Sequence, residues 1–306
     1  MAASREYGRT PGRKSLQEGQ VSRIQVVNKD SGAVRTVLEL DTLVEAPNWT
    51  RDGRWLVING GGKLWKLPAD GSGGLTEIFT GRVQDCNNDH VLSPDNSEIF
   101  VSSLGHLYRL PFTGGEPRQV SNNKPADSGY LYYLHGISPD AATLVYTAVE
   151  PYGGAPRGRL NIATIPADGG EDRWVINTLA RSDGPEYTPD GKWIYFNSEF
   201  AAKRPGHAQI FRIAVGGGAI EQMTFDDRVN WFPHFSPDGK WMAYISYEQG
   251  TVTHPADMNI ELRVMPAEGG ESRAVVSLFG GQGTFNVNSW APDNTHFAYV
   301  AYPFLD

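Results

Sequence analysis

Short apolar runs recur along the chain about 45 residues apart, which is the spacing of β-propeller repeats. Each run is six residues long and rich in β-branched and aromatic residues, which is typical of a β-strand. Repetition of this kind predicts a fold built from similar blades. The six runs are RWLVIN (54–59), EIFVSS (98–103), TLVYTA (143–148), WIYFNS (193–198), WMAYIS (241–246) and HFAYVA (296–301).

A polar tetrapeptide of the Ser-Pro-Asp-Gly type precedes each run. Proline sets φ for a turn, aspartate accepts hydrogen bonds from backbone amides two residues later, and glycine or asparagine tolerates positive φ. We therefore interpret the repeated aspartates as structural residues of tight turns. They are Asp52, Asp95, Asp140, Asp190, Asp238 and Asp293.

A second hairpin follows five of the six runs, with a glycine-rich turn between two more strands, as in HLYRLPFTGGEP (106–117). The sixth hairpin is missing after HFAYVA, but residues 22–40 have the same strand, turn and strand pattern. We expect this N-terminal hairpin to complete the last blade, which leaves no sheet edge unpaired at the seam of the ring. The sequence thus predicts an all-β fold, a single six-bladed β-propeller of four-stranded blades at 22–306, after a flexible leader at 1–21.

One face of such a ring collects most of the histidines. The segments that lead into the innermost strands open on the same face as the connections between second and third strands, and the tetrapeptide turns open on the opposite face. Because the blades are radial, side chains on the first face converge on the axis, and we predict a polar pocket at the channel mouth. Six of the seven histidines fall there: His90, His135 and His234 at the start of innermost strands, and His106, His207 and His254 in the connections.

Chemical roles follow from these positions. The catalytic candidates are His234, His135 and Glu186, because imidazoles and carboxylates transfer protons when burial tunes their pKa values. Taken singly, a histidine at a strand end can equally be a structural capping or stacking group. Long connections at 150–159, 199–208 and 248–259 are expected to be irregular loops that wall the pocket. The candidate ligand-binding residues are Asp89, Asp183, Glu199, His207, Trp231, His254 and Asn288.

Composition narrows the classes of partner. The net charge is −8, the pI is about 5.4, and no basic cluster lies beyond the leader, so we expect no nucleic-acid partner. Cys86 is the only cysteine, which excludes an internal disulfide. The N-terminus lacks the apolar stretch of a secretory signal, and no run of about 18 apolar residues could span a bilayer. We therefore expect a cytoplasmic location, no membrane contact and, because nothing marks an exposed apolar edge, a monomer.

The repeats resemble those of the TolB-like β-propeller family across residues 22–306. Runs such as DHVLSPD (89–95), YLHGISPD (133–140) and NWFPHFSPDGKW (230–241) are similar to those of short, stand-alone cytoplasmic members. The resemblance implies the six-bladed fold. Function has to be argued from the site, because propellers host enzymes, receptors and scaffolds alike.

A more distant resemblance is to oligogalacturonate lyase, a propeller of the same repeat type that holds a divalent metal through histidines and a glutamine and cleaves uronides by β-elimination. In this chain the corresponding stretch, 280–288, has a glutamine but no histidine, so the lyase site is not carried over residue by residue. A divalent ion held by His90, His135 and His234 is a further expectation. Mixed imidazole and carboxylate donors favour Mn, Zn or Fe, and no organic cofactor is expected.

Two classes of function stay open. The first is an enzyme, a lyase or hydrolase with or without a metal, that binds and acts on a small polyhydroxylated, carbohydrate-like ligand in the pocket. The second is a non-catalytic interaction scaffold of the TolB type, in which a protein partner binds the loop face.

Overall fold

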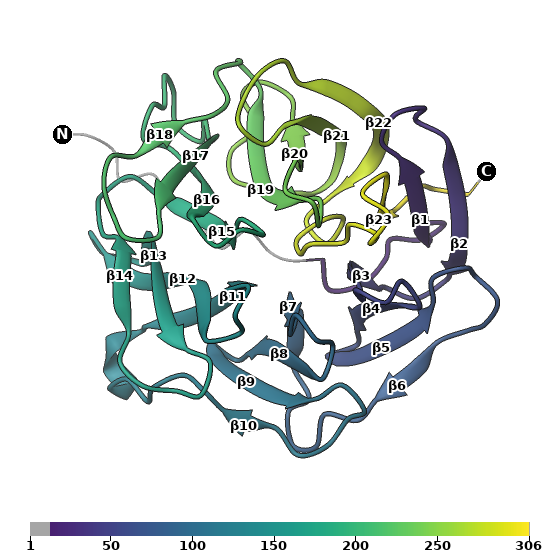
Figure 1. The fold of residues 1–306 in the computed structure, drawn as a ribbon, viewed down its shortest axis with the longest axis horizontal. Helices are drawn as coiled ribbons and strands as arrows, with labels where there is room; N and C mark the ends of the chain where they lie inside the picture. The colour runs from purple at the N-terminus through teal and green to yellow at the C-terminus, as the bar shows by residue number, and fades with distance from the viewer. Residues whose placement is uncertain (1–12, 306) are drawn as a thin grey trace.

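The computed structural model describes residues 13–305, which fold into six antiparallel sheets arranged as blades around one axis (Figure 1). The all-β prediction is confirmed, since a single turn of 3₁₀ helix, Ala126–Ser128, is the only helix in that part of the chain. No helix among these residues is long and apolar enough to cross a membrane. In five of the six sheets the strands run up and down in sequence order.

Five blades have four strands each, and their innermost strand comes first in the sequence. Blade one holds β3 (Glu45–Trp49), β4 (Trp55–Gly60), β5 (Lys63–Pro68) and β6 (Thr76–Ile78). Blade two holds β7 (Cys86–Leu92), β8 (Glu98–Ser103), β9 (His106–Pro111) and β10 (Arg118–Gln119). Blade three holds β11 (Leu131–Ile137), β12 (Thr143–Tyr152), β13 (Ala155–Pro166) and β14 (Arg173–Ile176). Blade four holds β15 (Ser182–Tyr187), β16 (Trp193–Ser198), β17 (Gln209–Ala214) and β18 (Glu221–Gln222). Blade five holds β19 (Val229–Phe235), β20 (Trp241–Tyr247), β21 (Ala256–Pro266) and β22 (Arg273–Gly281).

Blade six joins strands from opposite ends of the sequence. Its β23 (His296–Ala301) pairs antiparallel with β1 (Ser22–Asn28), which in turn pairs with β2 (Val34–Leu40). The innermost position is taken by the segment before β23, which reaches that strand through a bridge between Trp290 and Phe297. The prediction that the N-terminal hairpin completes the last blade is confirmed.

The repeated tetrapeptides form the turns between first and second strands. In blade five, the Ser236 hydroxyl donates to Asp238 Oδ1 at 2.6 Å, and the same oxygen accepts the Lys240 N–H at 3.1 Å. The Ser236 hydroxyl oxygen accepts the Trp241 N–H, also at 3.1 Å. Blades one to four repeat the contacts centred on aspartate. These aspartates are structural turn residues, as predicted.

The innermost strands are irregular at a shared level of the ring. Register shifts interrupt the pairing of β3, β7, β11, β15 and β19 with the second strand of each blade. In three of these strands the backbone takes positive φ, at Ala46, Gly184 and Phe232. A bulge twists its strand and re-aims the local side chains. Residues at these irregular positions line a cavity on the axis.

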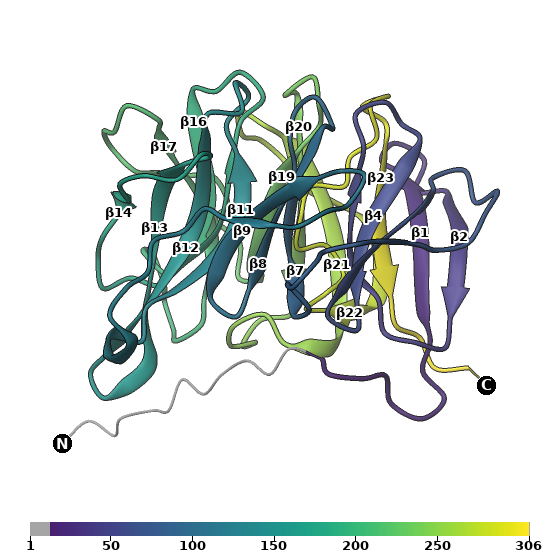
Figure 2. The ribbon, with the colours of Figure 1, turned by 90° about the horizontal axis from the view of Figure 1, so that it is seen from below.

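In blade three, the connection between the second and third strands differs from the expected irregular loop. The irregular connection predicted at 150–159 is wrong, because β12 and β13 stay paired as far as Tyr152 and Ala155. Gly153 and Gly154 join them with φ of 61° and 85°, and a two-residue type I′ hairpin turn requires positive φ at both positions. The result is a long hairpin with one irregularity in the pairing, between Glu150 and Tyr152 (Figure 2).

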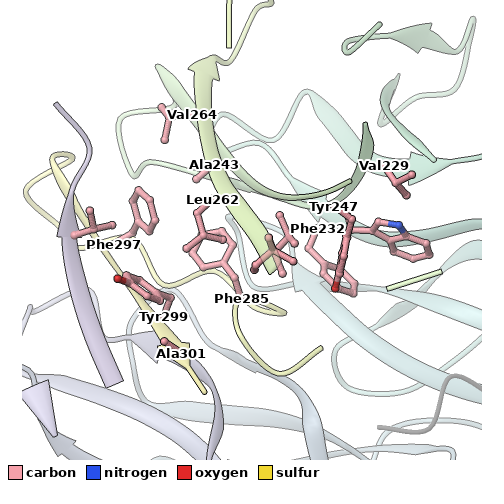
Figure 3. Packing of buried hydrophobic residues seen from close by; sticks show 14 of the residues in the cluster. Val229, Phe232, Ala243, Tyr247, Leu262, Val264, Phe285, Phe297, Tyr299 and Ala301 are labelled. Carbon is pink, nitrogen blue, oxygen red and sulfur yellow. The ribbon is translucent and has the colours of Figure 1, made fainter. Parts of the chain in front are cut away.

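Apolar side chains pack between neighbouring blades. Between blades five and six, Phe285 lies among Leu262 of β21 and Phe297 and Tyr299 of β23 (Figure 3). Comparable clusters lie between the two blades of each remaining neighbouring pair. Each blade therefore depends on two others to bury its faces.

Closure of the ring makes β1 as important to stability as an internal strand. Ile24 is fully buried in the cluster shared by blades six and one. We expect Ile24→Ala to lower the free energy of unfolding by about 2–5 kcal/mol, because it opens a cavity in a tightly packed core. Urea denaturation measures this loss. The matched control Gln25→Ala, at a half-buried neighbour in the same strand, loses one exposed hydrogen bond to Thr36 Oγ1. It should lower the free energy of unfolding by no more than about 1 kcal/mol. Equally small losses for both variants would show that β1 is dispensable.

Candidate functional site

A cavity of about 740 Å³ opens on the axis, on the face where the innermost strands begin. This is the place where the sequence predicts a polar pocket. All six blades contribute to its wall. Five predicted site residues line it, namely Asp89, His135, Asp183, Trp231 and His254, together with Glu45, Asn59, Asp85, Asn88, Tyr133, Thr147, Arg181, Phe232, Gln282 and Asn286.

One repeat position supplies a lining residue from every blade. This position lies five residues before the first residue of each turn tetrapeptide, as Asp183 lies before Thr188. The six blades hold five different residue types there, so the wall is chemically asymmetric although the backbone repeats. The six residues are Glu45, Asn88, Tyr133, Asp183, Trp231 and Asn286.

The chain before the first blade also reaches the cavity. Residues 13–21 run beneath the ring toward β1 (Figure 2), and Arg13 and Lys14 line the cavity. Arg13 Cζ lies 3.5 Å from the centroid of the Tyr302 ring, and Nη2 donates to Asp257 Oδ1 at 2.7 Å. From Arg13 onward the predicted leader therefore packs against the ring. Its first twelve residues lie outside the described part of the chain.

An imidazole and a carboxylate form a buried pair on one wall. His135 Nε2 lies 3.3 Å from Asp183 Oδ1, and the Thr147 hydroxyl donates to the same oxygen at 2.7 Å. Burial opposes charge on both groups. Even so, the carboxylates of Asp89 and Asp183 raise the pKa of His135, and His135 holds the pKa of Asp183 well below its usual range. The carboxylate thus favours the protonated form of the ring, and the ring favours the ionised form of the carboxyl group.

His254 stands across from this pair, in the loop between β20 and β21. Its ring packs on Trp231 and Phe232, with centroids 4.4 and 5.1 Å away. Nδ1 lies 2.5 Å from Gln282 Oε1, and Nε2 lies 3.9 Å from Asp183 Oδ2. Burial lowers the pKa of His254, although the Asp183 carboxylate acts in the opposite direction. At neutral pH this ring is uncharged.

Glu45 is a cavity residue that the sequence-based prediction misses. Its carboxyl oxygens accept hydrogen bonds from Asn59 Nδ2 at 3.2 Å and from Asn88 Nδ2 at 3.5 Å. Burial raises the pKa of Glu45 to about 7, against those hydrogen bonds and the charge of Arg13. The signal that identifies Glu45 is its repeat position, which in blade four is held by Asp183.

Three predicted site residues form a separate buried joint. His234 Nδ1 lies 2.5 Å from Glu186 Oε2, and His234 Nε2 lies 3.1 Å from Phe285 O. Asn288 Nδ2 donates to the other Glu186 oxygen at 2.6 Å. Both ring nitrogens are thus engaged inside the protein, and the contacts tie blades four, five and six together. His234, Glu186 and Asn288 do not line the cavity.

The remaining candidates also lie apart from the cavity lining. His90 is fully buried with Nε2 3.3 Å from Val57 O, and burial lowers its pKa to about 4. In the loop after β16, Glu199 accepts the Gly206 N–H, and His207 Nε2 lies 3.0 Å from Asp226 O.

The residues expected to bind a metal do not form a ligand set in this structure. Within residues 13–305, no group of three or more His, Cys, Asp or Glu side chains is placed to hold a metal ion. His234 in particular has both ring nitrogens occupied by Glu186 and a backbone carbonyl. A divalent metal stays a prediction, and the chemistry of the cavity is derived from its side chains alone.

The joint around His234 predicts a loss of stability on mutation. We expect His234→Ala to lower the free energy of unfolding by about 3–5 kcal/mol, because Glu186 is left buried without its partner. Guanidinium denaturation measures the loss. His106→Ala is the control, since that ring is half-buried and its Nδ1 lies 3.1 Å from the Ser121 hydroxyl and 3.4 Å from Gln119 Nε2. Its cost should stay within about 1–2 kcal/mol, that of one or two hydrogen bonds. Equal costs would contradict a structural role for His234.

Glu45 predicts an unusual dependence of stability on pH. The folded chain holds the Glu45 proton up to about pH 7, whereas the unfolded chain releases it near the ordinary value of 4.5. Between these values the folded state binds more protons, so stability falls as pH rises. We expect Glu45→Gln to remove about 1–3 kcal/mol of this fall between pH 5 and pH 8. Parallel stability profiles for the two chains, from melts at several pH values, would exclude a raised pKa.

Comparison with known proteins agrees with the fold. Residues 138–303 match the family model of the TolB beta propeller domain. An uncharacterized protein of Agrobacterium fabrum is 36% identical over 286 residues, which cover 92% of each chain. The solved structure of a provisionally named TolB from Agrobacterium tumefaciens is also 36% identical, with a TM-score of 0.84 over 94% of this chain and 99% of that one.

A more distant likeness concerns the fold alone. A solved oligogalacturonate lyase in complex with manganese has a TM-score of 0.55 at 18% identity, covering 87% of this chain and 74% of that one. The lyase shares the propeller, whereas the family model matches more than half of this chain and one relative aligns along nearly all of it. The chain belongs to the TolB β-propeller family.

Proposed function

We propose that the cavity binds a small polyhydroxylated, carbohydrate-like ligand and acts on it by acid–base chemistry of the lyase or hydrolase type. The observation that carries this proposal is the presence in one cavity of two carboxyl groups with opposite pKa shifts, Glu45 and Asp183. Two carboxyl groups whose pKa values are shifted in opposite directions can take different roles, one as a proton donor and the other as a permanent anion. Glu45 is the proton donor at neutral pH, and Asp183 is the anion that orients His135.

The lining supports a neutral, hydroxyl-rich ligand. Trp231, Phe232 and Tyr133 offer aromatic surface beside side-chain amides, a mixture typical of small-molecule sites. The formal charges of the lining nearly balance, and Glu45, with a pKa raised by burial to about 7, is about half protonated at neutral pH. A balanced wall gives no strong preference for a charged ligand. The formal charges are those of Arg13, Lys14 and Arg181 against Glu45, Asp85, Asp89 and Asp183.

Protein binding on the same face is the second candidate function. The observation that favours it is a set of exposed apolar side chains in the connections of this face, namely Leu104, Tyr152, Leu179 and Val252. Exposed apolar groups gathered on one side of a molecule support a partner surface. A partner would depend on these connections, whereas a small ligand depends on the cavity wall, so substitutions in the two sets separate the functions.

Calorimetric titration with neutral mono- and oligosaccharides tests the first candidate. We expect at least one sugar to bind, and we expect Asp183→Asn to weaken binding about 10-fold or more, because an ionised hydrogen-bond acceptor is lost. Glu45→Gln should retain binding and lower turnover about 100-fold, because it removes the proton donor and keeps the shape.

The matched control is Glu271→Gln, an exposed carboxylate in the turn between β21 and β22 on the opposite face. It should bind the sugar as the unaltered chain does. If no sugar binds, or if Asp183→Asn binds as tightly as Glu271→Gln, the cavity is not a carbohydrate site. Melting curves of each variant distinguish lost binding from lost folding.

A further inference from the structure

The hydrogen bonds beside His254 form a chain whose direction is fixed at one end. The Gly283 N–H is a backbone donor, and it reaches Asn286 Oδ1 at 2.8 Å. The oxygen of the Asn286 amide is thereby assigned, so its Nδ2 group points at Gln282 Oε1, 3.1 Å away. A side-chain amide is oriented by its hydrogen-bond partners, and here a backbone group orients the first amide.

The orientation of the Gln282 amide in turn decides which ring nitrogen of His254 carries the proton. Its Oε1 accepts from Asn286, and its Nε2 donates to Asn88 Oδ1 at 3.3 Å. The same Oε1 lies 2.5 Å from His254 Nδ1. Because a carbonyl oxygen only accepts, Nδ1 carries the proton. In the neutral ring the other nitrogen, Nε2, then has a free lone pair.

Packing directs this lone pair at the cavity. The ring is held against Trp231 and Phe232, and its side chain keeps 16% exposure. Nε2 lies 3.9 Å from Asp183 Oδ2, which is too far for a direct hydrogen bond. Two acceptors therefore face each other across a gap that a donor group of a ligand can bridge. The charged and titratable groups around the ring are Asp183, Arg181 and His135.

We propose that His254 is the proton acceptor of the cavity, with Nε2 held unprotonated and directed at a ligand hydroxyl beside Asp183. The proposal rests on the function proposed above and supplies the base that Glu45 and Asp183 leave unassigned. When the ligand O–H bond breaks, the proton bonds to Nε2 and the electron pair stays on the ligand oxygen. The imidazolium that forms lies 3.9 Å from the Asp183 carboxylate, which stabilises it.

Nitrogen-15 NMR of the ligand-free chain tests the assignment. At neutral pH we expect His254 to carry its proton on Nδ1, with Nε2 at the shift of an unprotonated nitrogen. His254→Gln identifies the signal by its loss. Asn286→Asp still accepts from the Gly283 N–H but cannot donate to Gln282, so that amide rotates and the proton moves to Nε2. Gln282→Glu is the matched control, measured with the labelling at a pH high enough to keep the ring neutral beside the added carboxylate: it accepts from Nδ1–H and preserves the native tautomer.

Chemical labelling gives a second readout. Diethyl pyrocarbonate acylates unprotonated imidazole nitrogens, so peptide mass spectrometry should find His254 labelled in the unaltered chain. Labelling at Nε2 should be lost in Asn286→Asp and kept in Gln282→Glu. A proton on Nε2 in the unaltered chain, or the native tautomer in Asn286→Asp, would overturn the proposal.

Neither measurement uses a sugar, so the two proposals fail separately. A chain that shows the expected tautomer but binds no sugar contradicts only the proposed ligand. A chain that binds sugar with Nε2 protonated contradicts only the role of His254.

Discussion

The antiparallel pairing of β1 with β23 is the contact on which the ring depends. Every blade buries apolar surface against two neighbours, so an open seam would expose a sheet edge and part of the core. Backbone pairs from Arg23 with Ala301 to Asn28 with His296 close that seam. The cavity follows from this closure, because only a closed ring holds six innermost segments facing one another across an axis.

Regular β-structure gives way where the innermost strands converge. The bulges place non-glycine residues such as Ala46 and Phe232 at positive φ, a conformation that costs of order 1–3 kcal/mol for each residue. Burying Glu45 and the pair of His135 with Asp183 adds a desolvation cost at the same level. The cores between blades have to offset these costs. The innermost strands around the axis are thus the least regular part of the fold. Departures from regular structure are expected at functional sites.

Repetition is the reason that the fold was predictable from sequence. Turn residues such as Asp238 have local, repeated roles, and the hairpin that is missing at the C-terminal end of the sequence is present at the N-terminal end.

The location of the candidate site was predictable from the sequence, but only some of the residues that line it were. The criterion that a residue lies where an innermost strand begins selects both Asp183 and His234. Asp183 lines the cavity, whereas His234 belongs to the buried joint. A bulge changes the side of the sheet that the following residues face. The simple alternation of side chains along a strand does not predict where bulges occur. Glu45 was recoverable from its repeat position, whereas the contact of Gln282 with His254 joins loops of two blades and has no repeated counterpart.

The closing pair of strands also imposes an order in time. During synthesis β1 and β2 emerge before the other described strands, and their partner β23 emerges after all of them. Domains begin to fold while the ribosome is still extending them, so the hairpin waits beside a growing arc of blades. Throughout that interval its edge can pair with another nascent chain. The contact that closes the seam of the finished ring therefore leaves one edge of β1 open until translation has passed β23.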